Sequence, residues 1–130
     1  MIWLVALGGA LGSVSRFLLG PAIQRALGFT YPFGTFPFGT LFINVAGSLI
    51  VGIVAGLATD GGTLSPEART FLAIGFCGGF TTFSTFGLET VVLLEAGQVG
   101  RAGAYIIASV ALSVTAAFLG LLAARQFLSR

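Results

Sequence analysis

Four long apolar stretches, separated by shorter segments rich in turn-forming and charged residues, make up most of the sequence. They cover residues 2–20, 39–58, 67–94 and 102–122. An α-helix needs about 20 apolar residues to cross a bilayer, and each stretch approaches or exceeds that length. Pro, Gly and charged residues between them favour loops, the first of which runs from Pro21 to Phe38. The pattern predicts an all-α membrane protein, with four transmembrane helices in one domain.

The third stretch contains a segment that is poorly suited to a continuous helix. Two adjacent glycines, Gly78 and Gly79, precede four hydroxyl residues within Thr81–Thr85. Glycine is a weak helix former, and Ser and Thr side chains can bond nearby backbone instead. A broken helix is tolerated in lipid only where its freed carbonyls are buried in protein or face water or an ion. We therefore expect a deliberate break near residues 78–82.

Composition excludes several classes of protein. Only 8% of the 130 residues are charged and 56% are hydrophobic, whereas soluble domains carry about 25% charged residues. The chain has no His and one Cys, which leaves no His-Cys zinc site, disulfide framework or Ser-His-Asp triad within one chain. No nucleophile–base pair suggests an enzyme, and no basic cluster suggests nucleic acid. These observations indicate a multi-pass protein of the cell membrane.

Polar residues inside the apolar stretches are the candidates for function. Asn44 is either an amide that joins two helices or a donor and acceptor along a polar path, because an unpaired amide in lipid is costly. Arg16, expected near the end of the first helix, is either a snorkelling side chain or a cation at a water-filled mouth. Glu89 is expected toward the membrane surface. One face of the fourth helix presents three hydroxyls at a spacing of four residues: Tyr105, Ser109 and Ser113.

Four phenylalanines also recur at a spacing of three or four residues around the expected break, and are predicted to lie roughly on one helical face: Phe76, Phe80, Phe83 and Phe86. They are either a packed or lipid-facing stripe or the lining of a path. Small residues at a spacing of four, Gly8 with Gly12 and Ser48 with Gly52 and Gly56, are typical of closely packed membrane helices.

The arginines predict an unusual topology. Four spans place both termini on one side of the membrane, together with Arg69, Arg125 and Arg130, and leave Arg16, Arg25 and Arg101 for the other side. Membrane proteins orient by an excess of Lys and Arg in cytoplasmic loops, and here the two sides are equal. Such a chain can insert both ways and assemble as an antiparallel dimer.

Three motifs resemble those of the Fluc (CrcB) family of fluoride channels. Gly75–Phe86, with its Thr-Thr-Phe-Ser-Thr-Phe core, resembles the family signature. Gly8–Phe17 is similar to the first-helix motif, with Ser13 and Phe17 where Ala and Tyr are expected, and Gly39–Asn44 with Gly47 is similar to the second-helix motif. The resemblance covers the whole chain.

This resemblance implies a fluoride-specific channel that exports fluoride passively, built as a dual-topology homodimer with two pores. It implies one structural sodium ion at the dimer centre, bound by the backbone carbonyls of Gly78 and Thr81 from both subunits. Residues implied along the fluoride pathway are Asn44, Phe83, Phe86, Tyr105, Ser109 and Ser113, with the edges of the two phenyl rings facing the anion. Glu89 would lie near a pore end, and Arg16 is the second candidate for the pore mouth.

The strongest alternative is a small dual-topology, proton-coupled drug exporter, which also has four short helices and balanced arginines. It needs a carboxylate deep in the membrane. The first helix offers none, and Glu89 is expected too near a helix end. A third alternative is a non-conducting assembly subunit, in which Asn44 and the phenylalanine pair would only pack.

Overall fold

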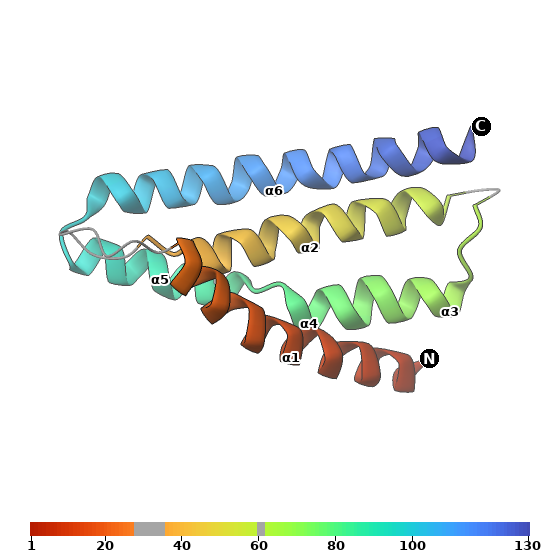
Figure 1. Ribbon diagram of the computed structural model, residues 1–130, viewed down its shortest axis with the longest axis horizontal. Helices are drawn as coiled ribbons and strands as arrows, with labels where there is room; N and C mark the ends of the chain where they lie inside the picture. Colours follow the sequence, from red (N-terminus) through yellow and green to blue (C-terminus); the bar gives the residue numbers. More distant parts are fainter. Residues whose placement is uncertain (28–35, 60–61) are drawn as a thin grey trace.

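The computed structural model describes residues 1–27, 36–59 and 62–130, which form a bundle of long helices (Figure 1). In chain order the elements are α1 (Ile2–Leu27), α2 (Phe38–Leu57), α3 (Pro66–Arg69), the π-helix η1 (Thr70–Cys77), α4 (Gly78–Phe80), α5 (Phe83–Glu95) and α6 (Val99–Leu128). The third apolar stretch thus comprises α3, η1, α4 and α5.

Four segments are long and apolar enough to cross a membrane: Ile2–Leu27, Phe38–Leu57, Pro66–Glu95 and Val99–Leu128. Both chain termini lie at the same end of the bundle as α3, while α5 and the start of α6 lie at the opposite end (Figure 1). The prediction of an all-α membrane protein with four spanning segments is confirmed, as is the break in the third.

The first and last helices are longer than predicted. α1 continues through Pro21 to Leu27, so the loop predicted to begin at Pro21 begins later, and its residues 28–35 lie outside the described part of the chain. A proline inside a helix removes one backbone hydrogen bond, which is tolerated in membrane helices where neighbouring groups satisfy the freed carbonyl. The fourth helix extends beyond the predicted 102–122 at both ends.

Glycines let the helices approach backbone to backbone. Along α2 and α6, which lie side by side (Figure 1), a Cβ atom added to Gly52 would lie 3.0 Å from the Cα of Ala117. Between α1 and η1, a Cβ atom on Gly8 would lie 2.8 Å from the backbone nitrogen of Phe76 and 2.9 Å from the Cα of Gly75. Both contacts belong to the small-residue patterns seen in the sequence. The first brings α2 against α6, and the second brings α1 against the broken third helix.

The break falls at Thr81 and Thr82, within the predicted range. Thr81 has φ −84° and ψ 158°, and Thr82 has φ −151° and ψ 120°, so both are extended while Gly78 and Gly79 remain helical. The π-helical turns of η1, which precede α4 and the break, had no signal in the sequence. Such segments are rare and often accompany functional sites.

A glycine turn ends α5 and directs the chain into α6. Gly97 has φ 74°, a conformation that glycine adopts without steric cost. The amide of Gln98 donates to the carbonyl of Leu93 at 2.9 Å, and that of Gly97 donates to Leu94 at 3.0 Å. These are the two bonds of a Schellman motif, and they place the start of α6 beside α5.

Candidate functional site around the helix break

Asn44 of α2 pairs with both backbone groups of Thr82. Its Nδ2 donates to the Thr82 carbonyl at 2.9 Å, and its Oδ1 accepts from the Thr82 amide at 2.8 Å. Peptide groups that leave a helix inside an apolar bundle must find partners, and one side-chain amide supplies both of them here. Asn44 therefore joins two helices, which was one of the two interpretations left open, and it does so at the break.

The Thr82 hydroxyl begins α5 as its N-cap. Its Oγ1 accepts from the amide of Thr85 at 3.2 Å and donates to the Thr85 hydroxyl at 3.0 Å. An N-cap of this kind satisfies one of the amides that the first turn of a helix leaves unpaired. Sequence reasoning assigned no role to Thr82 or Thr85, because a cap can be recognised only after the helix start is known.

The bond from the Thr82 amide to Asn44 and the bond from the Thr85 amide to the Thr82 hydroxyl change the surroundings of the Gly78 and Thr81 carbonyls. In an unbroken α-helix each N–H donates to the carbonyl four residues earlier, so the Thr82 amide would bond Gly78 and the Thr85 amide would bond Thr81. Here the first donates to Asn44 and the second to the Thr82 hydroxyl. The carbonyls of Gly78 and Thr81 lose their helical donors. Both are oxygen ligands of the kind that a hard cation takes.

Arg16 lies against the break instead of at a helix end. Its Nε donates to the Gly79 carbonyl at 3.1 Å, and the Ser13 hydroxyl reaches the same oxygen at 3.5 Å. Because α1 continues to Leu27, Arg16 lies well inside this helix. Its predicted position near the end of the first span is therefore wrong, and the reason is the helix extension through Pro21.

A cavity of about 450 Å³ lies on one side of the break. It brings together five of the six residues that the resemblance implied for the pathway, from α2, α5 and α6: Asn44, Phe83, Phe86, Ser109 and Ser113. Gly78, Thr81 and Thr82 line it as well. The remaining wall is mostly apolar, with Val51, Val110 and Val114 among its residues.

Ser109 contributes an unusual group to this cavity. The residue is only 8% exposed, and its Oγ is buried without a hydrogen-bond partner among the described residues. By contrast, the Ser48 hydroxyl in the same wall donates to the Asn44 carbonyl at 2.7 Å. A buried hydroxyl without a partner costs about 1–3 kcal/mol. Ser109 thus adds an unpaired polar group to the wall of the cavity.

The phenylalanines do not form one continuous face. Phe76 and Phe80 stack on each other before the break, with centroids 5.4 Å apart, and Phe80 is buried. Phe83 and Phe86 follow the break, line the cavity and lie 5.5 Å apart at an interplanar angle of 44°. The prediction of a single stripe is wrong because the extended residues between them interrupt the helical periodicity. The first pair packs within the chain, and the second pair faces the cavity.

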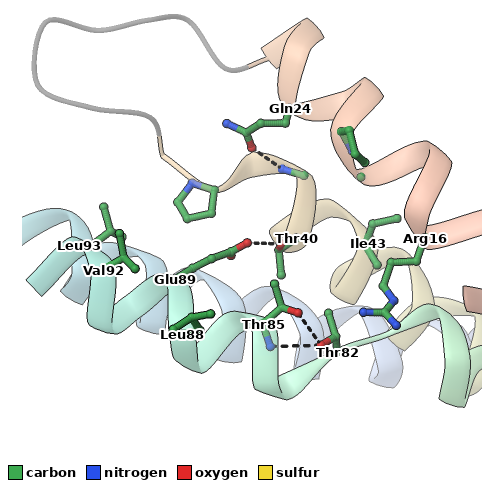
Figure 2. Close-up of a pocket in the computed structure, with 14 residues that line it drawn as sticks. Arg16, Gln24, Thr40, Ile43, Thr82, Thr85, Leu88, Glu89, Val92 and Leu93 are labelled. Atoms are coloured by element: carbon green, nitrogen blue, oxygen red, sulfur yellow. Dashed lines mark hydrogen bonds between the residues drawn. The ribbon is translucent and has the colours of Figure 1, made fainter.

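A second cavity, of about 580 Å³, lies on the other side of the break (Figure 2). Arg16 and Glu89 both line it, and Thr82 lines both cavities. Glu89 accepts from the Thr40 hydroxyl at 2.7 Å and from the Tyr105 hydroxyl at 2.6 Å. Glu89 is therefore held in the middle of α5 between two donors. It lies in the second half of the third span, Pro66–Glu95, and its position toward the membrane surface stays a prediction.

Tyr105 separates from the two serines with which it shares a helix face. It is fully buried, its hydroxyl goes to Glu89, and its ring packs edge-on against Phe86 with centroids 5.1 Å apart. Ser109 and Ser113 line the first cavity, whereas Tyr105 is not among the lining residues of either. It connects the carboxylate of one cavity to a ring of the other.

Gln24 is a further polar residue that the sequence did not single out. Its Oε1 accepts from the Gly39 amide at 2.9 Å (Figure 2). Its Nε2 donates to the Phe36 carbonyl at 2.9 Å. It caps the start of α2 from the end of α1, which was expected to be loop. Phe36 in turn packs on Tyr105, with centroids 5.6 Å apart.

Metal ligands of the usual side-chain types are not grouped in the described residues. No cluster of three or more His, Cys, Asp or Glu side chains occurs there. Backbone carbonyls and hydroxyls, the oxygens present at the break, are ligands of hard cations more than of transition metals.

Comparison with known proteins matches residues 3–121 to the family described as CrcB-like protein, Camphor Resistance (CrcB). A protein of Nitrobacter hamburgensis named fluoride-specific ion channel FluC 1 is 52% identical over 90% of this chain and 89% of its own. The fluoride-specific ion channel FluC of Nitrobacter winogradskyi is 53% identical, and one from Thermus thermophilus is 50% identical, over the same shares of each chain.

Proposed function

Because this chain belongs to the CrcB family, we propose that it is a fluoride-specific ion channel, through which fluoride leaves the cell passively. It is a multi-pass membrane protein and not an enzyme. The observation that carries the proposal within the chain is the cavity beside the break, which combines the rings of Phe83 and Phe86 with the unpartnered hydroxyl of Ser109.

The chemistry of this cavity suits a small anion that gives up part of its hydration. Removing all the water from fluoride without replacement would cost tens of kcal/mol, and one hydrogen bond to a charged group returns only about 1.5–3 kcal/mol. No single side chain can carry the ion. A series of weak donors is required, and the edges of aromatic rings are positive enough to belong to it. Ser109, Ser113 and the two rings provide such a series along α5 and α6.

A structural sodium ion at the break is the next part of the proposal. The carbonyls of Gly78 and Thr81 have lost their helical donors, and Gly78 has open space on its Cα side, with nothing within 4 Å of an added Cβ. Carbonyl oxygens freed from a helix are used in membrane proteins to coordinate alkali cations. Two such oxygens from each of two copies would supply four ligands. The ion would provide a fixed positive charge near the fluoride path.

The second copy is proposed to be antiparallel. Phe83 is 83% exposed in one chain although it lines the cavity, so a second chain could complete the wall. Arg16 is held within the bundle, which leaves Arg69, Arg125 and Arg130 at the terminal end against Arg25 and Arg101 at the other. This small difference is a weak orientation signal and supports insertion in both directions.

Fluoride flow in this proposal follows the electrochemical gradient. The membrane potential is worth ~2.3 kcal/mol per charge per 100 mV and drives anions outward from a cell that is negative inside. The inwardly placed acid, Glu89, has both oxygens bonded to Thr40 and Tyr105. Such a carboxylate is held in place as an acceptor, which supports a structural role in a passive pathway.

The test is halide flux from liposomes that contain the purified protein. We expect rapid fluoride efflux, measured with a fluoride electrode, and chloride efflux no faster than from protein-free liposomes. Fluoride efflux should also persist when a protonophore abolishes any proton gradient. Equal chloride and fluoride efflux would refute fluoride specificity, and dependence on a proton gradient would refute passive flow.

A further inference from the structure

The bonds around the break give Asn44 and Thr82 a role that lining the fluoride path does not require. We propose that these two side chains are positioning residues for the cation site, because each removes the backbone donor that would otherwise occupy one of its carbonyl ligands. This inference rests on the proposed sodium site. It assigns to Asn44 an action on the cation in addition to any contact with the anion.

The Gly78 carbonyl depends on Asn44. The Thr82 amide would donate to Gly78 in an unbroken helix, but it donates to Asn44 Oδ1 at 2.8 Å. The Asn44 Nδ2 bond to the Thr82 carbonyl, at 2.9 Å, holds the same residue from its other side. Two bonds fix the orientation of the Thr82 peptide groups, so Thr82 stays extended and the Gly78 oxygen stays without its helical donor.

The Thr81 carbonyl depends on the Thr82 hydroxyl. The Thr85 amide would donate to Thr81 in a continuous helix, but it donates to Thr82 Oγ1 at 3.2 Å. The Thr81 hydroxyl donates back to the Cys77 carbonyl at 2.7 Å, and so does not compete for the Thr81 carbonyl. The two proposed ligands are therefore freed by two different bonds, and Thr82 takes part in both.

The Gly79 carbonyl, unlike those of Gly78 and Thr81, accepts a hydrogen bond from a side chain of the described residues. Gly79 lies between the two proposed ligands, and its oxygen accepts from Arg16 Nε at 3.1 Å. A cation is already bonded to that oxygen, so it is unsuited to a metal ion. Arg16, from α1, thus occupies the Gly79 carbonyl, whereas Asn44, from α2, keeps the Thr82 amide away from the Gly78 carbonyl.

Loss of either bond, from the Thr82 amide to Asn44 or from the Thr85 amide to the Thr82 hydroxyl, should favour a continuous helix across the break. In Asn44→Leu the Thr82 backbone groups lose both partners, and unpaired groups in an apolar bundle are costly. The least costly rearrangement returns the Thr82 amide to the Gly78 carbonyl, in direct competition with the cation. Thr82→Val has the same consequence for Thr81, whereas Thr82→Ser keeps the capping hydroxyl.

The experiment measures sodium dependence in two independent ways. The first is the sodium concentration that gives half-maximal fluoride efflux from liposomes, with potassium replacing sodium at constant ionic strength. The second is the thermal unfolding midpoint of the purified protein against sodium concentration, because an ion that binds only the folded state raises that midpoint. The second readout does not depend on conduction.

We expect Asn44→Leu and Thr82→Val each to require about tenfold more sodium in both assays, the loss that corresponds to one ordinary hydrogen bond. Thr82→Ser should stay within about twofold of wild type, because its hydroxyl still caps α5. Ser109→Ala is the matched control. It should lower fluoride efflux and leave the sodium requirement unchanged, since Ser109 lines the same cavity but its hydroxyl makes no hydrogen bond to the described residues of the break.

The outcomes separate this inference from the proposed function. Reduced efflux in Asn44→Leu at the wild-type sodium requirement would overturn the inference and leave Asn44 as a pathway donor alone. A wild-type protein indifferent to sodium in both assays would overturn the sodium site itself, while fluoride efflux stayed intact. If Asn44→Leu does not fold, the comparison of Thr82→Val with Thr82→Ser decides, and equal sodium requirements in that pair would refute the inference.

Discussion

Removal of the Ser109 hydroxyl should stabilise the protein and at the same time slow fluoride. The Oγ is buried without a partner among the described residues, in a side chain that is 8% exposed. A buried hydroxyl of this kind carries a desolvation cost of about 1–3 kcal/mol. Ser109→Ala removes that cost and one heavy atom, so we expect a net gain of about 1 kcal/mol in the free energy of unfolding. Most core substitutions have the opposite sign.

The effect on conduction has a different origin. If fluoride accepts a hydrogen bond from Ser109, loss of that bond removes about 1.5–3 kcal/mol of stabilisation along the path. Part of the loss is recovered from water that stays with the ion, so we expect fluoride efflux to fall by about tenfold. Efflux is measured with a fluoride electrode on liposomes, and stability by thermal unfolding of the same preparation.

Ser48→Ala is the matched control for stability. Ser48 lines the same cavity, but its hydroxyl already donates to the Asn44 carbonyl at 2.7 Å, so its removal carries no gain of this kind. The reasoning is refuted for stability if Ser109→Ala destabilises the protein as much as Ser48→Ala does. It is refuted for conduction if Ser109→Ala is more stable and conducts fluoride at the wild-type rate.

Two further predictions concern the rings and the topology. Phe83→Ile and Phe86→Ile should both sharply reduce fluoride efflux because they remove ring edges, but only Phe86→Ile should also lower stability, by about 1 kcal/mol, since Phe86 packs edge-on against Tyr105 at 5.1 Å while Phe83 is 83% exposed; wild-type efflux in both variants would contradict the ring pathway. Thr63→Lys adds a positive charge at the terminal end and should fix one orientation, which abolishes efflux when this variant is expressed alone; full activity of a protein shown by cysteine labelling to have one orientation would contradict the antiparallel dimer.

The sequence predicted the number of spans and the position of the break because both depend on local composition. Mean apolarity over a helix length identifies a span, and the Gly-Gly and Thr-Thr pairs weaken a helix wherever they occur. The end of α1 was predicted wrongly for a related reason. Pro21 is a local helix-breaking signal, but in lipid the surroundings decide whether the helix continues.

The partners of the polar side chains were less predictable than the spans and the break. The prediction for Arg16 rested on a helix that ends at Gly20, whereas α1 continues to Leu27. The partners of Arg16 and Glu89 lie far away in the sequence: the Gly79 carbonyl for Arg16, and Thr40 and Tyr105 for Glu89. Single-residue patterns carry no information on such pairings. The two hydrogen bonds between Asn44 and the Thr82 backbone were not predicted for the same reason.

The place of Glu89 bears on the choice between a channel and a proton-coupled exporter. The sequence argument against an exporter was that Glu89 lies too near a helix end, and in the structure it lies in the second half of the span Pro66–Glu95 and lines a cavity. Its hydrogen bonds supply a second argument. A carboxylate that exchanges protons for substrate must alternate between solvent and cargo, whereas both oxygens of Glu89 accept short bonds from Thr40 and Tyr105. To move between solvent and cargo, Glu89 would have to break both of these hydrogen bonds, and a hydrogen bond to a charged group is worth about 1.5–3 kcal/mol.

The positive charges near the break favour an anion over a cationic drug. Arg16 lines the same cavity as Glu89, and the sodium ion proposed at the break would add a second positive charge. A unit charge ~10 Å away attracts an anion by about 1.7 kcal/mol at an effective dielectric near 20, and it repels a cation by the same amount. Glu89 lies in the same cavity as Arg16 and offsets part of its charge. The preference for an anion therefore depends on the proposed sodium ion, whose removal should weaken it.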